Sequence, residues 1–104
     1  MSLTRTEIAR TGLELTANLE RSGLSRATAA IDLGFSERRL AETLAVGPAS
    51  DPVDVWLLRD YLDRAIREHG DEPAPWNVLT EAAHTQASRW FALREAPRAR
   101  DEAR

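Results

Sequence analysis

Apolar side chains recur every three or four residues along most of the chain, a spacing that places them on one face of a helix. This pattern predicts an all-α protein of about five helices with no strand. Thr4 and Glu7 have the spacing of a capping box, and Gly23 follows the last apolar position of the first helix. Residues suited to cap the later helices are Ser25, Ser36, Asp51 and Thr80. The helices are therefore expected at about 4–22, 25–33, 36–45, 52–69 and 80–90.

The fourth helix is expected to be the scaffold of the fold, because one stripe of it is continuously apolar. The residues of this stripe are Val55, Leu58, Leu62 and Ile66. On its surface, two i, i+4 ion pairs are expected: Asp60 with Arg64, and Asp63 with Arg67. Gly12 lies inside the first helix, where glycine is about 1 kcal/mol less favourable than alanine, so another helix is expected to approach closely there.

A length of 104 residues suits a single domain with one core. We expect residues 1–93 to form that helical domain, with an ordered loop at 71–78. From Arg94 onward the sequence REAPRARDEAR has no apolar stripe, so residues 94–104 are expected to be a charged, disordered tail.

The stretch from Leu24 to Leu44 has the layout of a helix-turn-helix. Ala30 is small enough for two helices to cross closely, and Gly34 follows four positions later, where the turn would lie. Phe35 and Leu40 would be the buried contacts of the second helix of the motif. This central helix-turn-helix predicts a DNA-binding protein, although a similar pattern also occurs in helical hairpins that never touch DNA.

In such a motif the second helix enters the major groove, and its first residues reach the bases. The side chains expected to contact bases are Ser36, Glu37, Arg38 and Glu42. Those expected to contact phosphate are Arg39, Arg26 and Arg5. Among the residues expected to contact bases, Arg38 is assigned to a guanine, because a guanidinium can donate to both O6 and N7.

The charge of the chain favours an alternative hypothesis. The formal net charge is -3, and the acids concentrate in residues 49–72, which disfavours non-specific binding to nucleic acid. The alternative is a protein–protein interaction module that keeps the helix-turn-helix shape without binding DNA. Between the two, DNA binding by a transcriptional regulator is the leading hypothesis, with double-stranded DNA as its partner.

The aromatic residues Trp56, Trp90 and Phe91 are numerous for so short a chain. Aromatic side chains that exceed what a core needs are enriched at interfaces between subunits. We therefore expect a homodimer that forms through the last two helices, with these three residues at its interface.

Other classes of function have little support in the sequence. The chain has no cysteine, its opening lacks the apolar core of a signal peptide, and its longest apolar run is far too short for a membrane span, so a cytoplasmic protein is expected. Glu81 and His84 form one E-x-x-H pair, whereas a metal centre of that type needs a second copy. No activated nucleophile or phosphate-binding loop is recognisable. The expectation is a protein that is not an enzyme and has no cofactor or metal.

Several runs carry a resemblance to a known family: DPVDVWLLRDYLDRAI at 51–66, the opening SLTRTEIARTGLELTANLERSGLS, and the later VLTEA and WFALR. With these runs the chain resembles a family of small bacterial proteins catalogued as a domain of unknown function. The resemblance implies a helical protein with a helix-turn-helix-like region, and it assigns no catalytic or binding residue. The positions associated with it are Trp56, Leu58, Arg59, Asp60 and Tyr61, and Arg59 and Asp60 are expected to form an internal pair.

Overall fold

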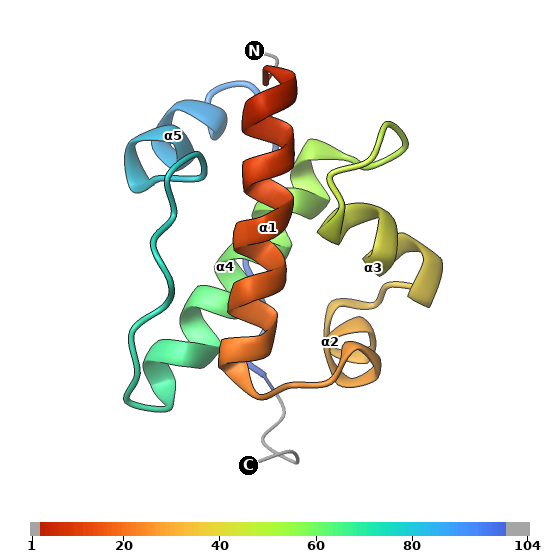
Figure 1. The fold of residues 1–104 in the computed structure, drawn as a ribbon, viewed down its shortest axis with the longest axis vertical. Helices are drawn as coiled ribbons and strands as arrows, with labels where there is room; N and C mark the ends of the chain where they lie inside the picture. Colours follow the sequence, from red (N-terminus) through yellow and green to blue (C-terminus); the bar gives the residue numbers. More distant parts are fainter. Residues whose placement is uncertain (1–2, 100–104) are drawn as a thin grey trace.

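The computed structural model describes residues 3–99, and this part of the chain holds five helices and no strand. The helices are α1 (Arg5–Ser22), α2 (Arg26–Leu33), α3 (Glu37–Leu44), α4 (Pro52–Glu68) and α5 (Glu81–Ala87). In Figure 1, α1 stands upright across α4, with α2 and α3 on one side of this pair and α5 on the other. The all-α expectation is confirmed. None of the described helices combines the length and the apolar character that a membrane crossing requires.

The local cap signals define where the helices begin. Thr4 and Glu7 form both hydrogen bonds of the capping box, at 3.1 and 2.9 Å. The other four predicted caps also accept a hydrogen bond from a backbone amide in the first turn of their helices. These contacts lie within a few residues of each other, so the sequence alone could reveal them.

The end of α5 differs from the prediction. The helix ends at Ala87 instead of continuing to Trp90. The amides of Trp90 and Phe91 both donate to the Ala87 carbonyl at 2.9 Å, so the chain turns sharply here. This turn brings Phe91 back against the core and leaves Trp90 71% exposed.

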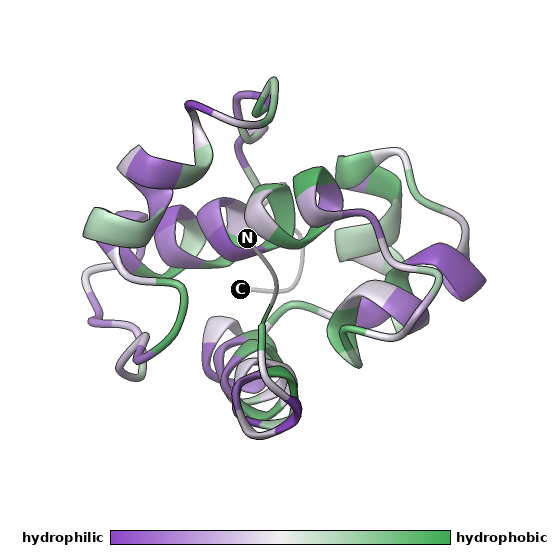
Figure 2. Cartoon of the chain, turned by 90° about the horizontal axis from the view of Figure 1, so that it is seen from above, coloured by the Kyte–Doolittle hydropathy of each residue, from purple (hydrophilic) through white to green (hydrophobic). Residues whose placement is uncertain are grey.

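The core lies mainly between α1 and α4. Leu15 of α1 and Leu58, Tyr61 and Leu62 of α4 are completely buried. Figure 2 shows the apolar stretches of the helices turned toward the middle of the molecule, while their outer turns are mostly hydrophilic. The predicted stripe of α4 is thus confirmed as buried, since Val55 and Ile66 are also buried.

Gly12 permits the close helix contact that its position predicts. A Cβ atom on Gly12 would lie only 3.2 Å from the carbonyl oxygen of Leu44, at the end of α3. The approach is between backbones, because the atom that it would meet is part of the main chain. α1 and α3 are therefore in direct contact at this point.

The connection from α4 to α5 is tied down by side chains of α1 and α4. Asn18 is completely buried and bonds both the amide and the carbonyl of Ala74, at 2.7 and 3.2 Å. The indole N–H of Trp76 donates to Asp63 at 2.9 Å. These bonds explain why an irregular segment is ordered.

The ion pairs on α4 follow the prediction only in part. Arg67 pairs with Asp63 at 2.9 Å as expected, but Arg64 pairs with Glu68 instead of Asp60. Asp60 is engaged by Arg59 at 3.2 Å and by His84 at 2.9 Å. The neighbours across the α4–α5 contact therefore decide the partner of Asp60, and the predicted Arg59–Asp60 pair is present.

Part of the expected tail is described. Residues 94–99 lie against α4, where the carbonyl of Ala96 accepts from Arg64 at 3.2 Å and Arg98 pairs with Glu68 at 3.2 Å. Ala96 is itself buried. The rest of the predicted tail, residues 100–104, lies outside the described residues.

Candidate nucleic-acid interface

A tight turn joins α2 to α3. Gly34 adopts φ 73°, a left-handed conformation that glycine reaches without steric cost. The amide of Phe35 donates back to the carbonyl of Ala30 at 2.8 Å, which closes the end of α2. Phe35 and Leu40 are buried as predicted, and they fix α3 against the rest of the domain.

The first turn of α3 points into solvent. Ser36, Glu37, Arg38 and Arg39 are all exposed. The Ser36 hydroxyl accepts from the amide of Arg39 at 3.1 Å, so it is the helix cap. No ion pair or hydrogen bond engages the side chain of Arg38 within residues 3–99, and this guanidinium can therefore contact a ligand directly.

Arg39 is held in place by the protein itself. Its Nε and one terminal nitrogen donate to the two carboxylate oxygens of Asp54, each at 2.7 Å. Its guanidinium also lies 4.2 Å from the centre of the Phe35 ring. The hydrogen bonds to Asp54 raise the pKa of Arg39 above its ordinary value, so the side chain stays charged. Arg39 thus joins α3 to the first turn of α4, and a phosphate contact would have to compete with Asp54.

Glu42 also has a structural partner. Its carboxylate accepts from the amide of Ala49 at 2.8 Å, and its carbonyl accepts from the amide of Gly47 at 2.9 Å. A side chain on Gly47 would collide with the Glu42 carboxylate. Glu42 therefore organises the loop between α3 and α4, and base contact would require it to leave this loop.

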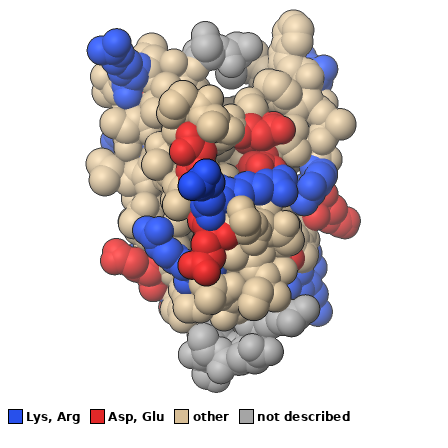
Figure 3. Space-filling view, turned by 90° about the vertical axis from the view of Figure 1, so that its right-hand side faces the viewer, with Lys and Arg blue, Asp and Glu red and all other residues tan. Residues whose placement is uncertain are grey.

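The remaining predicted phosphate contacts are far from each other. Arg5 and Arg26 are exposed at the start of α1 and α2, so the whole of α1, about 27 Å for its 18 residues, separates them. Figure 3 shows the face over α2 and α3, where the arginines lie beside acidic side chains instead of forming a band of one sign. Positive charge on this face is therefore limited to separate points and does not extend across it.

The three residues predicted at a dimer interface differ in exposure. Trp56 is buried within the chain, Phe91 packs partly against the core, and Trp90 is exposed. The rings of Trp56 and His84 are nearly perpendicular, with their centroids 5.1 Å apart. Trp90 is therefore the one of the three whose ring is free to meet a second molecule.

His84 and its neighbours form an ion-pair cluster. The His84 ring bonds Asp60 at 2.9 Å, and Arg59 pairs with Glu81 at 2.8 Å. Within the described part of the chain, no group of three or more acidic or histidine side chains is arranged to hold a metal ion. The cluster joins α5 to α4.

Comparison with known families identifies the relationship of the chain. Residues 1–92 match the family model of uncharacterised proteins conserved in bacteria known as DUF2316. The chain belongs to this family. Searches of curated proteins and of solved structures returned no match. The family description assigns no activity, so any function must be argued from the geometry of the chain.

Two features of the site were not predictable from motif spacing. Asp54 follows the cap and the proline of α4, a position that an acid often occupies simply to complement the helix dipole. Nothing near it in the sequence indicates Arg39 as its partner. The second feature is an apolar cavity, described below, whose walls come from distant segments.

Proposed function

We propose that the protein binds double-stranded DNA, as a cytoplasmic transcriptional regulator, with α3 as the reading helix. The observation that carries the proposal is the exposed first turn of α3, where Arg38 stands without a partner in residues 3–99. A guanidinium at this position of a reading helix has the reach and the donors to bind guanine.

The paired residues support the proposal in a different way. Because Asp54 and Phe35 hold Arg39, the first turn of α3 is fixed before any ligand arrives. Preorganisation reduces the ordering cost of binding. In this arrangement Arg38 reads a base, Ser36 and Glu37 lie beside it, and Arg39 keeps the helix in position.

Selection from a random pool of DNA duplexes at two salt concentrations tests the proposal. We expect an enriched site whose affinity falls as salt rises, because arginines displace counterions from phosphate. Arg38→Ala should weaken recognition at one base position by about 1 to 3 kcal/mol. No enrichment at low salt would contradict DNA binding.

A matched control is Arg89→Ala. Arg89 is exposed on the turn after α5, and its substitution removes the same charge. Figure 1 shows α5 on the opposite side of α1 and α4 from α3. We expect this variant to bind the selected site like the parent. Equal losses in the Arg38 and Arg89 variants would show a general charge effect in place of base reading.

A second candidate function is binding of a partner protein by the same face. It is favoured by the mixed charges of this face and by Ile31 of α2, a large apolar side chain that is 63% exposed. Under this proposal the selection from random DNA duplexes gives no enriched site. Ile31→Ser should prevent capture of the partner protein, whereas Leu13→Ser should not. Leu13, 72% exposed on α1, provides the control with an equivalent loss of apolar surface.

The homodimer is part of the leading proposal, with Trp90 as its exposed contact. Sedimentation equilibrium should give twice the mass of the chain, and Trp90→Ser should return the protein to a monomer. A monomer at concentrations far above those that saturate DNA would contradict it.

A further inference from the structure

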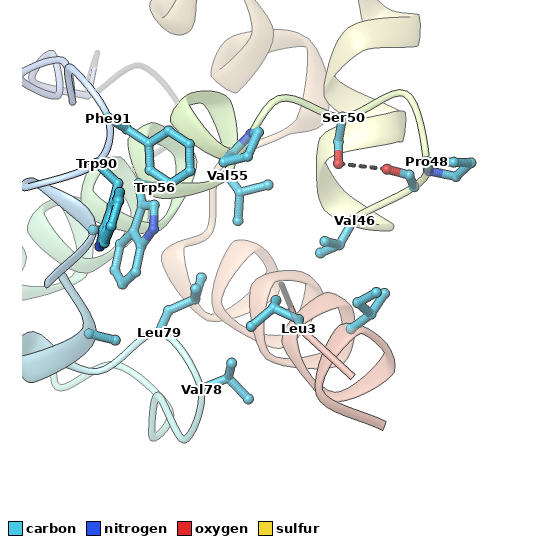
Figure 4. Close-up of a pocket in the computed structure, with 15 residues that line it drawn as sticks. Leu3, Val46, Pro48, Ser50, Val55, Trp56, Val78, Leu79, Trp90 and Phe91 are labelled. Atoms are coloured by element: carbon cyan, nitrogen blue, oxygen red, sulfur yellow. Dashed lines mark hydrogen bonds between the residues drawn. The ribbon is translucent and has the colours of Figure 1, made fainter. Parts of the chain in front are cut away.

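A cavity of about 490 Å³ opens where α1 begins, between α1, α4 and α5. The start of α1, the α3–α4 loop, the first turns of α4, residues 78–79, α5 and the turn at Phe91 each contribute to its wall. Figure 4 shows the rings of Trp56, Trp90 and Phe91 on one side of it, with Leu3 and Val46 on the other. Its volume lies in the range of small-molecule sites, about 300 to 1,000 Å³.

Among the described residues that line the cavity, none is charged. The hydroxyl of Ser50 donates to the carbonyl of Gly47 at 2.7 Å, so its hydrogen is already used. The indole N–H of Trp56 has no acceptor within residues 3–99, and Figure 4 shows its nitrogen on the side of the ring that faces the cavity. A charged ligand would lose its hydration here without a partner, whereas an apolar ligand with one acceptor would satisfy this donor.

The loop that forms one wall has an unusual backbone. Val46 has φ 49°, and it is the one residue other than glycine with a positive φ in the described range. A β-branched residue in this conformation is strained, and such residues persist where the surroundings hold them. The bonds from Glu42 to Gly47 and Ala49 hold this loop, so the side chain of Val46 stays at the cavity.

We infer that this cavity is a binding site for an uncharged, apolar small molecule that carries a hydrogen-bond acceptor. The aromatic rings supply contact area, and Trp56 supplies the donor. The concave shape and the ring-lined wall suit a small molecule better than the convex surface of a second chain. This site is separate from α3, so it is independent of base reading by Arg38, but it shares Trp90 with the proposed dimer contact.

Binding of a matched pair of dyes to the full chain tests the inference. N-phenyl-1-naphthylamine is uncharged, and 1-anilinonaphthalene-8-sulfonate has the same rings with one added sulfonate. We expect one molecule of the uncharged dye per chain, with quenching of tryptophan fluorescence, and binding of the sulfonate weaker by about tenfold because its charge would be desolvated. Equal binding of both dyes, or no binding of the uncharged dye, would overturn the inference.

Two neighbouring alanines of α5 provide the variants. Ala83 lines the cavity, whereas Ala82 is exposed and does not line it. The series Ala83→Val, Ala83→Leu and Ala83→Phe should weaken the uncharged dye progressively, to about tenfold or more for Phe, as the added volume fills the site. Ala82→Phe should leave binding unchanged. Thermal unfolding identifies any variant that fails to fold, and in that case the binding of the dye to the smaller variants Ala83→Val and Ala83→Leu provides the test. Equal losses of dye binding from substitutions at Ala83 and at Ala82 would refute the site.

The acceptor is tested with a second pair of compounds. Benzophenone and diphenylmethane share two phenyl rings and differ in the carbonyl group. We expect the ketone to bind more tightly by about fivefold, the worth of one neutral hydrogen bond. Trp56→Phe keeps a ring but removes the donor, and it should abolish this preference. A preference that survives in the variant would exclude Trp56 as the donor.

If a second copy of the chain occupied the cavity instead, sedimentation would show a dimer that the uncharged dye dissociates, with no dye bound to the intact dimer. That result would overturn the small-molecule site. Binding of the dye with no change in mass supports it.

Discussion

Arg38 and Arg39 are adjacent in sequence but have different physical roles. Arg39 is bound to Asp54 and stacked on Phe35, whereas Arg38 is exposed and unpaired among the described residues. The position of each side chain around α3 decides this difference. Only one of the two is therefore available to a ligand without a cost to the fold.

The stabilities of the two alanine variants test this difference directly. Arg39→Ala should lower the free energy of unfolding by about 1 to 2 kcal/mol, because it removes two charge-assisted hydrogen bonds whose value is reduced by solvent screening of the half-exposed arginine. Arg38→Ala should change it by less than about 0.5 kcal/mol. Urea unfolding of both variants gives the comparison. Equal stabilities would show that the Asp54 contact contributes nothing.

Gly12 is a second position where a single residue determines packing. Gly12→Val should destabilise the protein by about 2 kcal/mol, because its side chain meets the backbone at Leu44 and α3 must shift. Ala9→Val on the exposed face of α1 is the control, with an expected loss of about 0.5 kcal/mol from helix propensity alone. Thermal unfolding measures both. A Gly12 variant as stable as the control would contradict the close contact.

At the scale of elements, the stability of α5 comes from its polar contacts with α4 and not from its own length. Arg59 is buried in α4; it donates to the carbonyl of Leu79 at 3.0 Å and pairs with Glu81 at 2.8 Å. A helix of 7 residues is too short to be stable alone. We infer that Arg59 is the main anchor of α5 and of the segment before it.

Arg59→Met tests this anchor. We expect a loss of about 2 to 4 kcal/mol, because the Leu79 carbonyl and the charged partners lose a buried donor. Hydrogen exchange should accelerate selectively in residues 79–91. Arg67→Met, which removes an exposed partner of Asp63 on the same helix, should change stability by less than about 1 kcal/mol. Uniform exchange across the Arg59 variant would show that α5 is held by other contacts.

At the scale of the whole molecule, the charge distribution limits how DNA could be bound. The net charge is -3, and the predicted phosphate contacts without a partner in residues 3–99 are Arg5 and Arg26. Under the proposed function, log affinity should therefore fall with log salt at a slope of about -1.8 per chain, the value for two neutralised phosphates. The slope for a dimer is about twice this value.

Titration of the selected duplex across a range of salt concentrations measures that slope. A value steeper than the dimer allows would indicate that Arg39 and other paired arginines also leave their acids. A slope near zero would show that phosphate contacts contribute little, which contradicts DNA binding by this surface.

The sequence by itself determined the all-α class, the five caps, the turn at Gly34 and the buried stripe of α4. These features depend on residues within about four positions of one another, so spacing and residue type are sufficient to predict them. Only the tertiary structure decided that Asp54 engages Arg39, that Trp56 is buried, that Asp60 bonds His84 instead of Arg64, and that distant segments enclose the apolar cavity. Each of these features brings together residues that are well separated in the chain, so it is set by how the helices pack.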